Sequence, residues 1–151
     1  MNYETITIGG FSIIGVAIHT TNQNGQSQKD IAELWSRFMG QGLIAQIPNK
    51  ASNEIYCTYT EYESDFTGAY TTILGCKVTS LDEIPEGFVG KEISEATYKH
   101  YKAKGALPDC VGKVWGEIWQ SGMDRKYITD FDVYGEKSLN PHNAEVDIYV
   151  S

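Results

Sequence analysis

One succession of hydrophobic patterns occurs twice along this chain, and this repetition restricts its fold more than any other feature. Each half contains a β-type run, an amphipathic helical segment and two further β-type runs, as judged by the spacing of apolar residues. These segments are residues 5–20, 27–39, 54–62 and 69–79 in the first half, and residues 88–101, a helix starting at 107–109, 127–134 and 144–150 in the second. Each half is therefore predicted to be a β-α-β-β unit.

Matching residues recur at similar places in the two halves. Gly10-Phe11 corresponds to Gly87-Phe88, Trp35 and Gly42 to Trp115 and Gly122, and Tyr59-x-Glu61 to Tyr134-x-Glu136. This order indicates an internal duplication, with pseudo-repeats at 1–80 and 84–151. Two such units can share one antiparallel sheet with both helices on one face and a central cleft. We therefore predict an α+β fold in a single domain over residues 1–151.

The composition is that of a globular protein with an acidic balance. Hydrophobic residues make up 41% of the 151 residues, which is enough for a core without disulfides or metal. The formal net charge of -8 repels phosphate backbones and anionic lipids, so neither nucleic acid nor a membrane is expected as a direct partner. The N-terminus lacks the basic and apolar regions of a signal peptide, and we expect a cytoplasmic location.

Common motifs for metal, nucleotide or serine-hydrolase chemistry are missing from the sequence. Cys57, Cys76 and Cys110 are odd in number and widely spaced, which is typical of reduced core thiols. The three histidines are scattered, with no partner at the spacing of a helical metal site. We therefore expect neither a cofactor nor a metal.

Three segments in the last third carry a resemblance to a known family. They are W-G-E-I-W-Q-S-G at 115–122, D-F-D-V-Y-G-E at 130–136 and P-H-N-A-E-V-D-I-Y-V at 141–150. With them the chain resembles the gyrase-inhibitor-like (GyrI-like) effector-binding domains, which also occur at the C-termini of some AraC-type and MerR-type transcription regulators. The resemblance implies the same duplicated β-α-β-β fold over nearly the whole chain. No helix-turn-helix pattern precedes the first strand, so a stand-alone form is expected.

The resemblance also implies a ligand site, because the strand after the second helix in this family carries an acidic-x-Tyr motif in a cleft for hydrophobic, often cationic, ligands. The matching residues are Asp132 and Tyr134, although the family more often has Glu at the acidic position. Their two-residue spacing places both on one face of a strand. The alternative for Asp132 is a solvated edge carboxylate. Glu117 lies at the flank of a helical apolar stripe, where it either lines the rim of the cleft or faces water.

Aromatic residues are the other candidates for the site. Trp35, Trp115 and Trp119 lie on helical apolar stripes, and Tyr59 and Tyr70 lie in predicted strands. Each of these rings can be an ordinary packing residue. A ring in a cleft between two helices can also pack on one face and contact a ligand on the other.

These observations favour a non-catalytic module that binds a small hydrophobic or cationic molecule and is linked to transcription regulation or drug response, with a separate regulator protein as a possible partner. The alternative is a hydrolase of cyclic imides or esters, in which Asp132 or Glu117 with a tyrosine activates water. A third reading is an inhibitor of a partner such as DNA gyrase, although no concentrated acidic run supports it. Haem binding lacks a suitably placed histidine.

Overall fold

The computed structural model describes residues 2–151, which form one antiparallel sheet of eight strands and two α-helices. The strands are β1 (Glu4–Ile8), β2 (Phe11–Thr21), β3 (Ile55–Thr60), β4 (Ala69–Val78), β5 (Val89–Ile93), β6 (Ala96–Gly105), β7 (Thr129–Tyr134) and β8 (Ala144–Val150). The helices are α1 (Gln26–Gly40) and α2 (Asp109–Gln120), and short 3-10 turns lie at Gln23–Gly25, Leu43–Gln46 and Glu136–Ser138. The prediction of an α+β fold with a shared antiparallel sheet is confirmed.

The first strand of each half differs from its prediction, because each is divided into two. The predicted strand at 5–20 is interrupted at Gly9 and Gly10, and the extended segment at 88–101 is interrupted at Ser94 and Glu95 and continues to Gly105. Glycine tolerates the first of these breaks because it has no Cβ. The sequence pattern does not distinguish one bent strand from two strands, since apolar and polar residues alternate in the same way in both cases.

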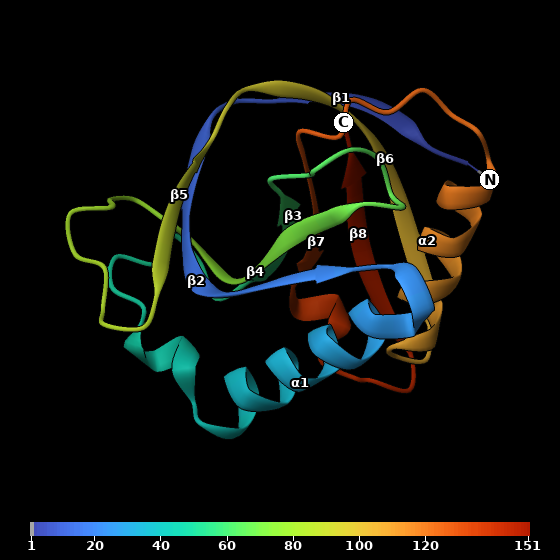
Figure 1. Ribbon diagram of the computed structural model, residues 1–151. Coiled ribbons are helices and arrows are strands. Elements are labelled where there is room, and N and C mark those ends of the chain that lie inside the picture. The colour runs from blue at the N-terminus through green and yellow to red at the C-terminus, as the bar shows by residue number, and fades with distance from the viewer. Residues whose placement is uncertain (1) are drawn as a thin grey trace.

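These divided strands exchange partners between the halves and close the sheet. The sheet order is β1-β6-β8-β7-β3-β4-β2-β5, so the first half contributes β1 to the edge of the second half, and the second half contributes β5 to the edge of the first. The register is the same on both sides of the break, with Ile8 opposite Ala96 and Phe11 opposite Ile93. The sheet therefore curls into a ring, with α1 and α2 on its outside (Figure 1).

Each helix buries its apolar stripe on the outer face of the ring. Leu34 and Phe38 of α1 pack with Ile14 and Leu74 of β2 and β4, and α2 packs in the same way on β6 and β8. The inner face is lined by a second set of apolar residues, which are Ile13, Ile73, Ile93, Tyr98, Phe131 and Val133. All three cysteines are free and buried, as predicted. Neither helix within residues 2–151 is long and apolar enough to cross a membrane.

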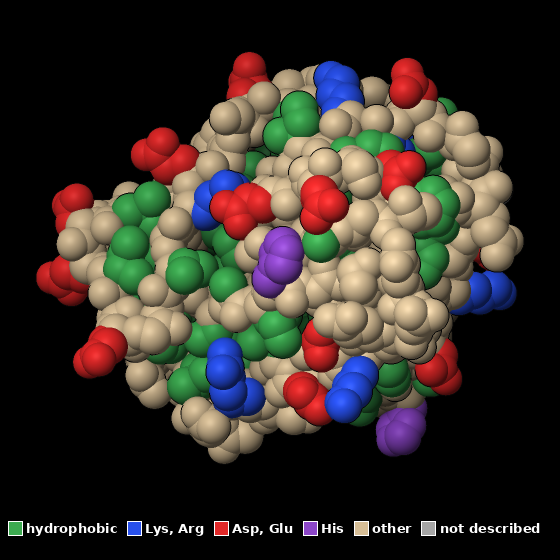
Figure 2. All heavy atoms as spheres, in the orientation of Figure 1, with side chains coloured by type: hydrophobic (Ala, Val, Ile, Leu, Met, Phe, Trp, Pro, Cys, Tyr) green, Lys and Arg blue, Asp and Glu red, His purple; other side chains and the backbone are tan. Residues whose placement is uncertain are grey.

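Charged groups are mixed over the visible surface. Figure 2 shows Asp and Glu side chains scattered across this face, with Lys and Arg between them and apolar side chains around them. The charged side chains on this face therefore do not form one acidic region.

Two glycines allow β2 and β4 to approach closely where the sheet bends. Gly15 and Gly75 lie opposite each other, and a Cβ on Gly75 would overlap with the backbone of Ile14 and Gly15. We expect Gly75→Ala to lower the free energy of unfolding by about 2 kcal/mol, because backbone must move to accept the methyl group. Urea unfolding measures this change. Gly116→Ala is the control, since its Cβ meets open space in α2 and should raise stability by about 0.5–1 kcal/mol. Equal unfolding midpoints for Gly75→Ala and wild type would contradict the close approach.

Candidate functional site between the two helices

A cavity of about 640 Å³ lies between α1, α2 and the outer face of the central strands. Its lining residues come from both helices, from β3, β4 and β7, and from the connecting loops; they are Asn22, Ser27, Gln28, Ile31, Ala32, Trp35, Tyr59, Tyr62, Phe66, Tyr70, Pro108, Asp109, Val111, Gly112, Lys113, Trp115, Trp119, Arg125 and Tyr134. The volume is within the range of small-molecule sites. The predicted central cleft is therefore present where the two halves meet.

The cavity lies over β3 and β7 because the helices leave these strands uncovered. α1 packs on β2 and β4, and α2 packs on β6, so the pair β3–β7 forms the floor between the helices. In this pair Cys57 lies opposite Asp132, and Tyr59 lies opposite Asp130. Alternation along each strand turns Tyr59, Asp132 and Tyr134 to the helix side, where they meet side chains of both helices.

Aromatic rings form most of the cavity wall and hold one another in place. Trp35 of α1 packs edge-on against Tyr134 of β7, with ring centroids 4.7 Å apart. Tyr59 packs edge-on against Trp115 of α2 at 5.3 Å. Such contacts fix ring orientation and stabilise each pair by about 0.5–1.5 kcal/mol beyond area burial. The wall is therefore built from residues that are far apart in sequence.

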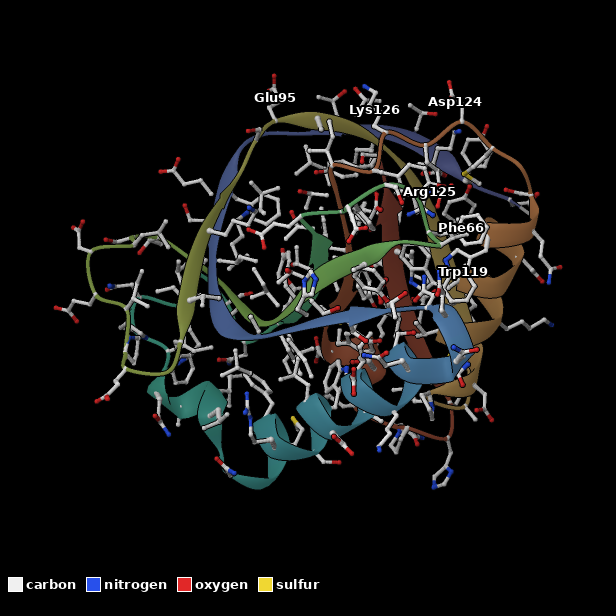
Figure 3. All side chains as sticks on the ribbon, in the orientation of Figure 1. Phe66, Glu95, Trp119, Asp124, Arg125 and Lys126 are labelled. Atoms are coloured by element: carbon white, nitrogen blue, oxygen red, sulfur yellow. The ribbon has the colours of Figure 1, made fainter. Side chains whose placement is uncertain are left out.

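One further pair crosses from a loop to a helix. Phe66 in the β3–β4 loop lies nearly parallel to Trp119 of α2, with ring centroids 6.3 Å apart and planes inclined by 7°. The loop is held by Asn22, whose Nδ2 donates to the Phe66 carbonyl oxygen at 3.0 Å and whose Oδ1 accepts from the Tyr70 hydroxyl at 2.6 Å. The Phe66–Trp119 pair lies on the α2 side of the molecule (Figure 3).

Asp132 lies beneath this aromatic wall and is completely buried. The Tyr59 hydroxyl donates to its Oδ2 at 2.7 Å, and Trp115 Nε1 donates to its Oδ1 at 3.0 Å. Burial raises the pKa of the Asp132 carboxyl to about 7, although both hydrogen bonds act to lower it. Within residues 2–151 no Lys, Arg or His forms an ion pair with this carboxylate. Asp132 is thus a buried acid without a protein counterion, poised to titrate near neutral pH.

Asp130, two residues earlier on the same face, is compensated in a different way. It is also completely buried, but Arg125 Nη2 donates to its Oδ2 at 2.8 Å. The Tyr62 hydroxyl donates to the same oxygen at 2.6 Å, and the Ser151 backbone N–H donates to Oδ1 at 2.8 Å. The charge of Asp130 is therefore balanced inside the protein, whereas that of Asp132 is not.

The structure brings most of the predicted site residues together. The aromatic candidates Trp35, Tyr59, Tyr70, Trp115, Trp119 and Tyr134 all line the cavity. Asp132 is not in the lining, because Tyr59 and Trp115 lie between its carboxylate and the cavity, and it is not the solvated edge carboxylate of the alternative. Glu117 is exposed on the other side of α2, beside His100 and Lys102, and not at the rim of this cavity. Two residues along a helix rotate the side chain by about 200°, so Glu117 points away from Trp115 and Trp119, which lie about one turn apart.

Sequence reasoning missed Phe66, Tyr62, Asn22 and Arg125. Phe66 lies in a turn-rich segment, where no periodicity assigns a side chain to a face. Arg125 lies in the irregular segment between α2 and β7, and a charged residue there is normally solvated. The described residues 2–151 contain no group of three His, Cys, Asp or Glu side chains that could hold a metal ion.

The raised pKa of Asp132 has a consequence for stability. Between about pH 4 and pH 7 the folded protein holds a proton here that the unfolded chain has lost, so the free energy of unfolding falls as the pH rises. From pH 4.5 to pH 7.5 this loss amounts to roughly 3 kcal/mol. Asp132→Asn removes the titration, so its stability relative to wild type should increase by this amount over the same range. Urea unfolding at several pH values measures the difference. A difference that stays constant with pH would contradict the assignment.

Comparison with known proteins places the chain in a family. Residues 6–151 match the family model of Cass2, described as an integron-associated effector binding protein. The chain is 24% identical over 144 residues to YobU of Bacillus subtilis, which is named as a transcriptional regulator; the match covers 91% of this chain and 89% of YobU.

Two solved structures share the fold over 99% of this chain. The integron cassette protein VCH_CASS2 of Vibrio cholerae is 31% identical, with a TM-score of 0.72 and 95% of its own chain covered. SAV2435, solved with tetraphenylphosphonium bound, is 17% identical, with a TM-score of 0.81 and 93% of its chain covered. The resemblance to effector-binding domains is therefore confirmed, and the chain belongs to the Cass2 family of integron-associated effector binding proteins.

Proposed function

We propose that this protein binds a hydrophobic organic cation in the cavity between α1 and α2. The observation that carries the proposal is Asp132, a completely buried carboxylate without a protein counterion in the described chain, directly behind the aromatic wall. A positive ligand in the cavity supplies the missing charge. The positive charge of the ligand attracts the Asp132 carboxylate across the rings of Tyr59 and Trp115, so the ligand does not need to touch the carboxylate.

The aromatic wall suits such a ligand. A cation over an aromatic face gains about 0.5–2 kcal/mol, and more where water is excluded. The Tyr59 hydroxyl and the Trp115 N–H both donate to Asp132, so ionisation of Asp132 makes both rings more electron-rich. Charge interactions in a site of low polarity are several times stronger than in water. The buried acid and the rings therefore act together on a bound cation.

The relatives support the same ligand class. SAV2435, which shares the fold, was solved with tetraphenylphosphonium, a large hydrophobic cation. YobU is named as a transcriptional regulator. We infer that binding in this chain is linked to transcription regulation or drug response through a separate regulator protein that recognises the loaded form.

The hydrolase alternative remains a prediction of the sequence. Asp132 and Tyr59 lie within hydrogen-bond distance, as that alternative requires, whereas Glu117 lies outside the cavity. An inhibitor that imitates nucleic acid requires a concentrated acidic surface, and the face shown in Figure 2 does not provide one.

Ligand binding should depend on pH through Asp132. A cation favours the ionised carboxylate, and that form increases as the pH rises through about 7. We expect the affinity for tetraphenylphosphonium to rise by up to roughly tenfold from pH 6 to pH 8. Isothermal titration calorimetry at both pH values measures it.

Two variants separate this mechanism from a general effect of pH. Asp132→Asn should bind more weakly than wild type at pH 8 and with nearly the same affinity at pH 6 and pH 8. Glu117→Gln, which changes a carboxylate outside the cavity, should behave as wild type. If the tenfold rise persists in Asp132→Asn, the assigned role of this residue is wrong. If wild type does not bind the cation at all, the proposed function is wrong.

A further inference from the structure

Arg125 is a positive side chain in the wall of a cavity for which we propose a positive ligand. It lies between Asp124 and Lys126, and Figure 3 shows those two side chains pointing to the outside while Arg125 points inward. Asp124 and Lys126 are exposed, whereas the Arg125 side chain is only 3% exposed. Arg125 is also one of the residues that line the cavity.

The guanidinium group of Arg125 is only partly satisfied. Its Nη2 donates to Asp130, and its Cζ lies 4.3 Å from the ring centroid of Tyr127 and 5.5 Å from that of Trp115. No atom of residues 2–151 accepts a hydrogen bond from its buried Nε or Nη1. Aromatic faces are weak acceptors, and buried guanidinium N–H groups are rarely left without an oxygen partner. These two nitrogens are the largest group of unmatched donors in the described chain.

The charge of Arg125 decides what kind of acceptor fits. Asp130 already neutralises it at 2.8 Å, so a second anion would leave excess negative charge in a buried place. A positive group of a ligand would be repelled near Arg125 and attracted near Asp132. An uncharged oxygen satisfies the donors at no such cost.

Trp115 lies between the two polar groups of the site, Asp132 and Arg125. Its Nε1 donates to Asp132 at 3.0 Å, and its ring centroid lies 5.5 Å from Arg125 Cζ. The two polar groups are thus separated by little more than one indole ring. A single molecule of drug size spans that separation inside a cavity of about 640 Å³.

We infer that Arg125 is a second recognition point of this cavity, and that the ligand carries an uncharged acceptor oxygen, such as a ketone or amide carbonyl, beside its positive group. This inference rests on the proposed function and narrows its ligand class. Arg125 selects among hydrophobic cations by the oxygen they present, while Asp132 selects for their charge.

A matched pair of cations tests the inference. The compounds are (4-acetylbenzyl)triphenylphosphonium and (4-isopropylbenzyl)triphenylphosphonium, which have the same charge and nearly the same shape and differ in the carbonyl oxygen. We expect wild type to bind the acetyl compound roughly tenfold more tightly in calorimetric titrations, because a hydrogen bond to a charged donor replaces an unmatched one. In Arg125→Lys, which keeps a positive charge for Asp130 but lacks the guanidinium donors, the two affinities should become equal within about twofold. Lys126→Ala, which changes the exposed neighbour, should keep the tenfold preference.

The outcomes separate this inference from the proposed function. If wild type binds both compounds equally, the inference is overturned and the proposed function stands. If Arg125→Lys keeps the full preference, the oxygen binds elsewhere and the inference is likewise overturned. If wild type binds neither compound, both proposals fail. Should Arg125→Lys not fold, as thermal melting would show, the two compounds still test the inference on wild type, where equal affinities overturn it and a tenfold preference for the acetyl compound supports it.

Discussion

The pairing of β3 with β7 is the contact on which the site depends. It joins the two halves, and its register places Asp132 opposite Cys57 and Asp130 opposite Tyr59. Because α1 packs on β2 and β4 and α2 packs on β6, the pair β3–β7 stays uncovered and becomes the floor of the cavity. A shift of one residue would turn both carboxylates to the inner face of the ring and remove the site.

The two carboxylates on β7 show how one fold treats equal charges differently. Asp130 has an ion pair with Arg125, so its burial is compensated within the protein. Asp132 has only the Tyr59 hydroxyl and the Trp115 N–H, which do not offset the loss of hydration, and its pKa rises to about 7. An apolar residue at 132 would avoid this cost. A costly acid directly behind a cavity wall is typical of functional sites, where stability is given up for binding.

Much of the fold and part of the site could be predicted from local pattern. The apolar stripes of the helices, the alternation in 144–150 and the two-residue spacing of Asp132 and Tyr134 each follow from backbone geometry, which is a local property. The exchange of β1 and β5 between the halves could not be predicted. The alternation of apolar residues in a strand shows which face is buried, but it does not show which strand pairs with it. The position of Glu117 was ambiguous for a related reason. A residue at the flank of an apolar stripe faces either the cleft or water, depending on how the helix is rotated against the sheet.

The sequence by itself determined the β-α-β-β repeat, the elements that carry the aromatic residues and the common face of the strand that Asp132 shares with Tyr134. Only the tertiary structure decided that Asp132 is covered by Tyr59 and Trp115, and that Phe66 and Arg125 reach the same cavity from irregular segments. The physical reason is range. Backbone periodicity acts over a few residues, whereas burial, the resulting pKa and the matching of hydrogen-bond donors depend on tertiary contacts such as that of Tyr59 with Asp132, which are 73 residues apart.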